Sequence, residues 1–265
     1  MHVLSKYKLI ILLAIISLTI TGCWEKENDQ PTNLAEGECR IVKSDQGDGV
    51  LSTLEYNSDG YLVKERAVYK SATGNSIYLH LYSYDADNKL VKYDVYVDDE
   101  PIEYTVYEYI NGVVSLLKKY TYSDIGLKEE IQSFKYSTDN KVIEQIMGDY
   151  KSVYTYDENE NIVLTETYFI STGKLMHRTR YEDYDDKPNY HSALKGIFLD
   201  PIYSSRNNHR KESNESVYED GSVNKGFEGY YTYEYNGNGY PSKVTLTDDT
   251  GTRRFYNISY TYQCN

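Results

Sequence analysis

The stretch Tyr82-Ser83-Tyr84-Asp85-Ala86-Asp87-Asn88-Lys89-Leu90 carries the pattern that decides the fold of this chain. Two tyrosines spaced two residues apart end one strand, Asp and Asn favour the backbone angles of a turn, and an aliphatic residue begins the next strand. The stretch therefore predicts a β-hairpin. Related copies of the pattern occupy residues 54–62, 107–114, 134–142, 154–162 and 233–239.

The copies are spaced regularly along the first half of the chain. The tyrosines that precede the turns, at positions 56, 84, 109 and 136, lie 25 to 28 residues apart, which fits two strands and two turns per unit. Between the turns, residues 77–84 alternate between an aliphatic face and a tyrosine-rich face, as a strand does. No segment before Tyr181 has an apolar face at helical spacing over three turns. The sequence predicts an all-β, antiparallel up-and-down meander.

Residues 1–22 are predicted to be a lipoprotein signal peptide rather than part of the fold. Lys6 and Lys8 give a basic start, and an apolar run from Leu9 to Ile20 is too short to span a bilayer comfortably. The small residues before Cys23 resemble a bacterial lipobox, which implies that this cysteine is acylated, as with palmitate, and becomes the mature N-terminus. The alternative is an ordinary signal peptide followed by a chance cysteine. Lipidation would anchor a soluble domain to a membrane without spanning it.

Residues 23–38 read as a flexible tether of mixed charge. The acidic residues directly after Cys23 resemble the export signal that sends some lipoproteins of Gram-negative bacteria to the cell surface. A charged tether alone would look the same, so an outer-membrane lipoprotein facing the periplasm is the alternative. Residues 39–265 are then expected to form a single β domain.

The charge balance excludes one class of partner. The chain has a formal net charge of −13, and loss of Lys6 and Lys8 with the signal peptide leaves 26 basic against 41 acidic residues, a net charge of −15. Nucleic-acid binding requires basic patches that neutralise phosphates, so no nucleic-acid partner is expected. The chain also contains 32 tyrosines against five phenylalanines and one tryptophan, which favours strands whose rings are partly wetted.

Two cysteines mark the ends of the meander. Cys39 begins the first expected strand and Cys264 ends the last one. In an exported chain such a pair is most often a disulfide, whose α-carbons lie within about 7 Å of each other. The first and last strands would then be neighbours, closing the meander into a barrel with an even number of strands, roughly 14 to 16. The alternative is two free thiols.

Residues 183–229 interrupt the repeat and are predicted to be one long insertion. Residues 191–199 have the composition of one short helix, and residues 204–225 are almost wholly polar. Long excursions within a compact domain tend to be functional or disordered. A barrel of this size leaves space that side chains do not fill, so we expect the insertion to plug or cover the barrel in part. It supplies the candidate binding residues, which are Tyr190, Phe198, Tyr203, Asn207 and Asn208.

The tyrosine-rich hairpins resemble those of the YD-repeat lipoproteins of Gram-negative bacteria. The end of the chain is similar to one of their families, a domain of unknown function with a porin-like fold. The matching stretches are Asp185-Asp186-Lys187-Pro188-Asn189, Asn207-Asn208, Tyr233-Glu234-Tyr235-Asn236, Gly239-Tyr240-Pro241 and Tyr262-Gln263-Cys264. The resemblance covers residues 39–264 and implies a porin-like barrel, with no catalytic residue to carry over. A true membrane porin is not expected, because residues 174–181 place His or Arg on both strand faces.

No catalytic site, metal site or cofactor is predicted. The histidines that remain after residue 22 show no metal-ligand spacing, and the Asp pairs occupy turns, where Asp bonds its own backbone. The leading hypothesis is a non-enzymatic, membrane-anchored cell-envelope lipoprotein that binds a ligand or a protein partner. The alternatives are a structural or interaction module without a small ligand, and a glycan-binding surface lipoprotein whose half-exposed tyrosines stack on sugars. A hydrolase would need an acid pair or a nucleophile at a recognisable spacing.

Overall fold

The computed structural model describes residues 34, 38–47, 49–198, 201–218 and 220–265. The expected signal peptide, the Cys23 lipidation site and most of the tether lie outside the described residues. The strands are β1 (Cys39–Asp45), β2 (Val50–Tyr56), β3 (Leu62–Ser71), β4 (Gly74–Tyr84), β5 (Leu90–Val97), β6 (Glu100–Ile110), β7 (Val113–Ser123), β8 (Gly126–Tyr136), β9 (Val142–Met147), β10 (Tyr150–Tyr156), β11 (Ile162–Phe169), β12 (Leu175–Glu182), β13 (Lys211–Val217), β14 (Val223–Tyr235), β15 (Pro241–Thr247) and β16 (Arg254–Cys264).

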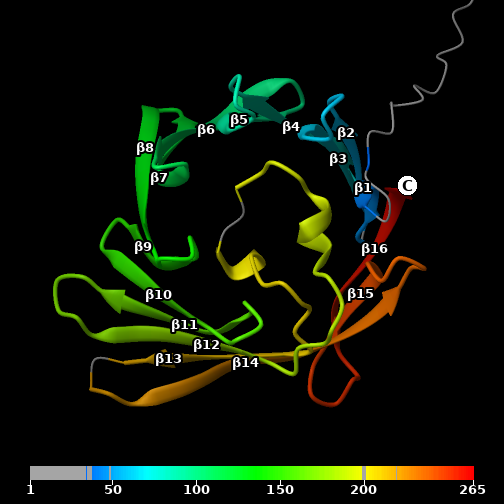
Figure 1. Cartoon of the computed structure of the whole chain (residues 1–265). Helices are drawn as coiled ribbons and strands as arrows, with labels where there is room; N and C mark the ends of the chain where they lie inside the picture. Colours follow the sequence, from blue (N-terminus) through cyan, green and yellow to red (C-terminus); the bar gives the residue numbers. More distant parts are fainter. Residues whose placement is uncertain (1–33, 35–37, 48, 199–200, 219) are drawn as a thin grey trace, which may run out of the picture. The chain divides into compact units, whose positions relative to one another are not determined.

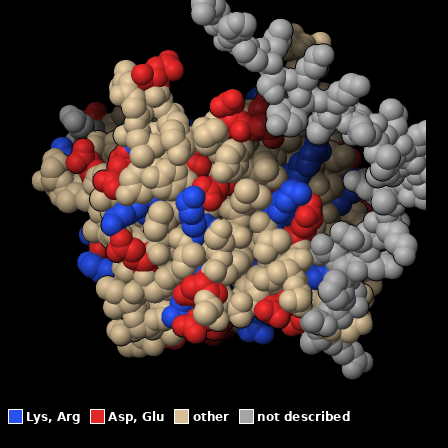
Figure 2. Space-filling model, turned by 90° about the horizontal axis from the view of Figure 1, so that it is seen from above, with Lys and Arg blue, Asp and Glu red and all other residues tan. Residues whose placement is uncertain are grey.

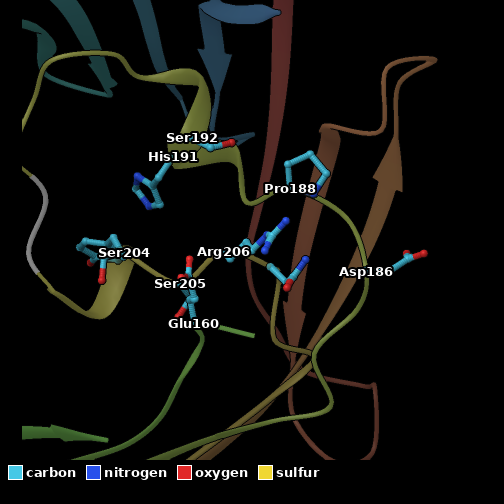
Figure 3. A pocket seen from close by; sticks show the side chains of 10 residues that line it. Glu160, Asp186, Pro188, His191, Ser192, Ser204, Ser205 and Arg206 are labelled. Carbon is cyan, nitrogen blue, oxygen red and sulfur yellow. The ribbon is translucent and has the colours of Figure 1, made fainter. Parts of the chain in front are cut away.

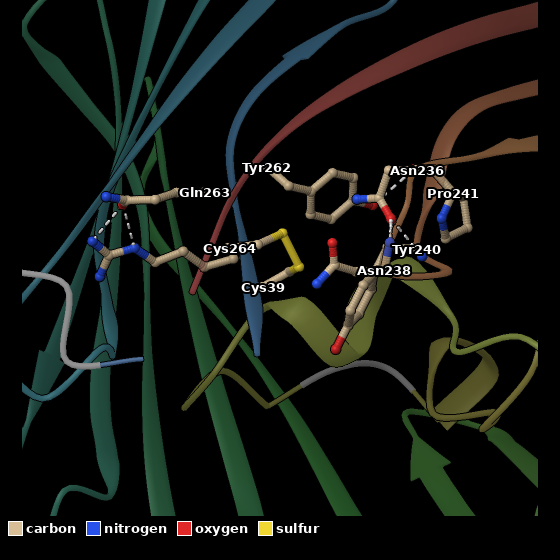
Figure 4. The surroundings of a disulfide bond; sticks show 9 residues. Cys39, Asn236, Asn238, Tyr240, Pro241, Tyr262, Gln263 and Cys264 are labelled. Carbon is tan, nitrogen blue, oxygen red and sulfur yellow. Dashed lines mark hydrogen bonds between the residues drawn. A yellow bond between two sulfur atoms is a disulfide. The ribbon is translucent and has the colours of Figure 1, made fainter. Parts of the chain in front are cut away.

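These sixteen strands form one closed antiparallel barrel in which each strand pairs with its neighbours in the chain, as Figure 1 shows. Closure occurs between β1 and β16, where Cys39 lies opposite Cys264. A disulfide joins these two cysteines, with α-carbons 4.1 Å apart (Figure 4). Next to it, the buried Arg40 side chain donates hydrogen bonds of 2.9 and 2.6 Å to Gln263 Oε1. The predicted all-β meander, its closure and its disulfide are confirmed.

In four of the repeats, the turn is built by the polar residue that follows the second tyrosine. Asp85 Oδ1 accepts hydrogen bonds from the backbone amides of Asp87 and Lys89, both at 2.9 Å. Asn88 adopts a φ of 59°, a left-handed conformation that Asn tolerates better than most residues. The same pair of bonds recurs at other repeat turns, whose acceptor residues are Asn57, Asp157 and Asn236.

In every repeat but the last, whose Tyr235 bonds the Asp185 carboxylate, the second tyrosine connects neighbouring hairpins. Tyr84 at the end of β4 donates its hydroxyl hydrogen to the Leu62 carbonyl at the start of β3, at 2.7 Å. A register shift lies directly before the tyrosine in its pairing with the following strand, and it recurs at the same position in successive repeats. The equivalent bonds join Tyr56 to Ile41, Tyr109 to Leu90, Tyr136 to Val114, Tyr156 to Val142, Tyr184 to Ile162 and Tyr262 to Pro241. We call these bonds the tyrosine clamps; they explain why tyrosine rather than phenylalanine fills the position.

The change Tyr56→Phe is expected to lower the free energy of unfolding by about 1.5 kcal/mol, because it leaves the Ile41 carbonyl without its buried donor. Tyr56 is 5 % exposed, so water does not replace the lost hydroxyl readily. The matched control is Tyr120→Phe on β7, whose hydroxyl bonds the exposed Glu129 carboxylate. Urea denaturation of both variants checks the prediction, and equal losses would contradict the role of the clamp.

The tyrosine-rich face of the strands lines the barrel interior. Ala67 pairs with Tyr78, and Val95 pairs with His80, and both aliphatic partners are buried. The opposite face carries exposed ion pairs between neighbouring strands, among them Lys64–Glu55 at 2.8 Å and Lys118–Glu108 at 2.5 Å. Acidic and basic side chains accordingly lie intermixed on the wall seen in Figure 2. In the part of the chain that the structure describes, no helix has the length and apolar character needed to cross a bilayer.

The insertion is shorter than predicted. Strands β13 and β14 occupy much of residues 211–229, so the excursion from the barrel wall is confined to residues 183–210. The sequence of β13, Lys-Glu-Ser-Asn-Glu-Ser-Val, has no apolar face, and the strand forms because its backbone pairs with both β12 and β14. The predicted helix over 191–199 is also wrong: it is reduced to the 3-10 turn η1 (Tyr190–Ala193), followed later by η2 (Pro201–Tyr203).

Candidate ligand-binding site

The excursion of residues 183–210, which we call the mouth segment, leaves β12 and returns to β13 through a paired neck. In Figure 1 it lies within the ring of strands. Asp185 N donates to Asn208 O, and Asn189 N donates to Arg206 O, both at 3.0 Å, so the two legs of the segment hold each other. The Asn208 side chain is 1 % exposed, and its Nδ2 donates to the Lys187 and Pro188 carbonyls. Asn208 therefore fixes the neck.

The tip of the mouth segment is docked on the rim where the repeat turns lie. Leu62 N donates to the Lys195 carbonyl at 3.3 Å, and the Lys195 ammonium lies 4.6 Å from the centre of the Tyr61 ring. Gly196 has a φ of +88°, and a β-carbon at this position would lie 2.2 Å from Tyr61 Cδ1, so glycine is required there. Phe198 packs edge-on against Phe134, with ring centroids 5.0 Å apart.

A second attachment holds the returning leg. Ile162 N, at the start of β11, donates to Ser205 Oγ at 3.0 Å. Asn207 N donates to Asn161 Oδ1 at 2.8 Å, and the Asn161 amide donates back to Asn207 Oδ1 at 3.3 Å. Asn161 and Ser205 are both buried. The mouth segment therefore closes part of the barrel mouth, as the sequence led us to expect.

Between the mouth segment and strands β12–β16 lies a cavity of about 360 Å³. Two histidines, two asparagines, Glu212, Val244 and Ile258 complete a lining that is mostly aromatic. We call it the tyrosine cavity, after the residues Tyr181, Tyr190, Tyr203, Tyr231, Tyr233 and Tyr256.

Neighbouring rings hold the tyrosine side chains of the cavity in place. Tyr190 of the mouth segment stacks on Tyr260 of β16, with centroids 4.8 Å apart and an interplanar angle of 22°. Tyr231 stacks with Tyr233 at 6.3 Å and meets Tyr256 edge-on at 6.1 Å. Burial raises the pKa of Tyr256 to about 12, so its phenol is neutral at physiological pH. The cavity thus presents fixed, neutral aromatic surfaces.

Glu212 of β13 is the carboxylate of the tyrosine cavity. Its Oε2 accepts the Tyr231 hydroxyl hydrogen at 2.8 Å and lies 3.8 Å from Nε2 of His209. Burial raises the pKa of Glu212, but the neighbouring His209 and Tyr231 side chains outweigh burial and leave the pKa below its ordinary value. The carboxylate is therefore ionised at neutral pH. His209 is itself surrounded by the rings of Tyr181, Tyr184 and Tyr231 in edge-on contacts.

His191 lies where the tyrosine cavity meets a second, more open pocket of about 470 Å³, which we call the mouth groove. Figure 3 shows His191 and Ser192 across this groove from Ser204 and Ser205. Burial lowers the pKa of His191 to about 3, so its imidazole is neutral. Neither ring nitrogen has a hydrogen-bond partner among the described residues.

The five binding residues predicted from the sequence do not form one site. Tyr190, Tyr203 and Asn208 line the tyrosine cavity, and Asn207 with Tyr203 lines the mouth groove. Phe198 lies apart, in a pocket with Tyr136, Tyr156 and Pro201. Sequence reasoning missed the wall residues Glu212, Tyr231 and Tyr256, because only the strand register brings them beneath the mouth segment. The signal that was present is the tyrosine alternation of residues 231–235 and 256–262.

No cluster of three or more metal-ligating side chains occurs among the described residues. The fold and the site therefore define a closed sixteen-stranded β-barrel with an aromatic cavity beneath a folded-in mouth segment.

Solved structures are similar to this barrel. A porin-like protein from Bacteroides uniformis matches with a TM-score of 0.51 and 11 % sequence identity, over 86 % of this chain and 98 % of that chain. A porin-like protein from Bacteroides vulgatus matches with a TM-score of 0.40 and 13 % identity, over 85 % and 99 % of the two chains. At so low a sequence identity, the first likeness concerns the fold alone. The second, with a TM-score below 0.5, supports no conclusion about this chain. No family model and no curated protein matches the sequence.

Proposed function

We propose that the chain is a non-enzymatic lipoprotein of the Gram-negative cell envelope, held by lipid on Cys23, and that its barrel binds a small ligand in the tyrosine cavity. The observation that carries the proposal is the cavity itself, where fixed aromatic surfaces surround an ionised carboxylate. Cavities of a few hundred cubic ångströms with an apolar lining and few polar groups are typical ligand sites.

The outer wall supports an anchored domain rather than a barrel embedded in lipid. A lipid-facing band is apolar. Here the corresponding face carries ion pairs on successive strands, such as Arg178 with Glu166 and Glu215, and Lys243 with Glu234. Residues 23–38 would give the barrel a tether to the outer membrane, with the domain on the cell surface.

A glycan-binding lipoprotein is the second candidate. The mouth groove favours it, because the 45 % exposed Tyr203 ring lies there beside Asn207 and Arg206. A half-exposed ring stacks on sugar faces, and amides and guanidinium groups bond sugar hydroxyls. The remaining candidate is a structural or protein-interaction module without a small ligand.

Two measurements test the proposal on the full-length chain in a Gram-negative host. Metabolic labelling with an alkyne analogue of palmitate is expected to mark the wild type and not Cys23→Ala. Thermal-shift assays of the purified acylated chain against panels of amines, sugars and amino acids are expected to find a ligand that raises the melting temperature. An unlabelled wild type would overturn the anchor. A failure of every panel would overturn the ligand-binding function and favour the structural module.

A further inference from the structure

We infer that the tyrosine cavity selects a quaternary ammonium ligand, with Glu212 facing the cation and tyrosine rings around its methyl groups. The inference rests on the proposed ligand-binding function and names the ligand class. It follows from the charge of the cavity, from the hydrogen bonds already made by its polar groups, and from the chemistry of the surfaces that remain.

The charge of the cavity favours a cation. Neither lysine nor arginine lines it among the described residues, and Glu212 is its only carboxylate. Oε2 of Glu212 accepts the Tyr231 hydroxyl hydrogen. The net charge of the whole chain is −13, which adds a long-range attraction for cations. An anionic ligand would meet an ionised carboxylate whose basic neighbour in the lining is His209, with Nε2 3.8 Å from Glu212 Oε2, and no lysine or arginine among the described lining residues.

The polar groups of the lining are mostly committed to the fold. The Asn189 side chain accepts from His191 N at 3.0 Å and donates to Asn207 O at 3.4 Å. The Asn208 amide donates to the carbonyls of the neck. The Tyr233 hydroxyl donates to the His209 carbonyl at 2.8 Å. A sugar needs many free donors and acceptors, and this lining offers few. The asparagine side chains could bond a sugar only by breaking hydrogen bonds that hold the mouth segment folded.

What remains available to a ligand is aromatic surface, the Glu212 carboxylate and the ring nitrogens of His191, which have no hydrogen-bond partner among the described residues. A primary ammonium has three N–H donors, each of which needs its own acceptor in a buried site. A quaternary ammonium has no N–H group. Its methyl groups share the positive charge and can contact the faces of the tyrosine rings. Cation–π contacts contribute about 0.5 to 2 kcal/mol each, and tyrosine cages with a carboxylate suit such ions.

Isothermal titration calorimetry of the full-length acylated chain in a polyoxyethylene detergent tests the inference. The probes are choline, its neutral carbon isostere 3,3-dimethyl-1-butanol, and glucose. Choline is expected to bind at least about ten-fold more tightly than the isostere. Glu212→Gln is expected to lower that ratio several-fold, because only the cation–π contacts then remain to favour the charged ligand. The matched control Glu234→Gln, on the outer wall, should preserve it.

A second variant guards against a folding defect in Glu212→Gln, because the carboxylate also accepts the Tyr231 hydroxyl. Tyr256→Leu removes one ring and retains every charge, so it should weaken choline binding several-fold without changing the wall. Equal binding of choline and its isostere by the wild type would overturn the inference. Binding of glucose without choline would overturn it and leave the proposed function standing. Binding of neither these probes nor any panel compound would overturn both.

Discussion

Replacing Cys39 with serine is expected to lower the free energy of unfolding by about 4 kcal/mol, and Cys264→Ser should have the same effect. The bridge joins positions 225 residues apart, for which the chain-entropy model gives about 5 kcal/mol, at the top of the observed range. Strand β1 depends on this bridge because it pairs with β2 only through residues 43–45. Without the bridge, β1 would be held by its six residue pairs with β16 and its three with β2.

A comparison of single and double variants makes this test sharp. Each single substitution already removes the whole bridge, so Cys39→Ser with Cys264→Ser should lose no more stability than either change alone. Urea denaturation followed by tyrosine fluorescence measures the three values, and reduction of the wild type with a thiol should reproduce them. Additive losses, or a wild type that is indifferent to reduction, would show that the bridge does not close the barrel.

The change Ile162→Ala is expected to lower the free energy of unfolding by about 3 kcal/mol. Ile162 is fully buried, at 0 % exposure, and packs in a cluster with Val142, Tyr154 and Tyr181. Removing a buried branched side chain forfeits its transfer free energy and leaves a cavity. The backbone of Ile162 also accepts the Tyr184 clamp and donates to Ser205 of the mouth segment.

Ile143→Ala is the matched control for Ile162→Ala. Ile143 lies on β9, which is separated from β11 by β10, and next to buried Val142, but is 39 % exposed. Its truncation is expected to lower the free energy of unfolding by less than about 1 kcal/mol. The side chain is already partly in contact with water, so removing it forfeits less burial and leaves no enclosed cavity. Chemical denaturation of both variants measures the difference. Similar losses at the two positions would mean that the rim residues of the repeats do not form a buried core.

The strands of the repeats could be predicted from sequence because their signals are local. The tyrosine alternation and the turn residues act within about ten positions, and the structure places strands at 77–84 and 142–147 as expected. Strand β13 could not be found in the same way. Its side chains are polar on both faces, and only its two neighbours determine that it is a strand. Missing it makes the insertion too long and leaves the strand count uncertain.

The binding site depends on information that no local pattern holds. Glu212 and Tyr231 are 19 residues apart and meet because β13 pairs with β14 in one register. The tyrosine clamps have the same origin, since each hydroxyl reaches a carbonyl of the strand before it, 14 to 22 residues away. The sequence contains these residues, but their partners follow from closure of the barrel and from the docked mouth segment.

Amide hydrogen exchange at Leu62 and Ile162 tests most directly whether the mouth segment is folded into the barrel and so creates the tyrosine cavity. The Leu62 amide is bonded to Lys195, and that of Ile162 to Ser205. Both amides should exchange at least about 100-fold more slowly than that of the fully exposed Ile125, and Ser205→Ala should accelerate Ile162 alone. Exchange of Leu62 and Ile162 as fast as Ile125 would mean that the segment is not docked and that the cavity does not exist.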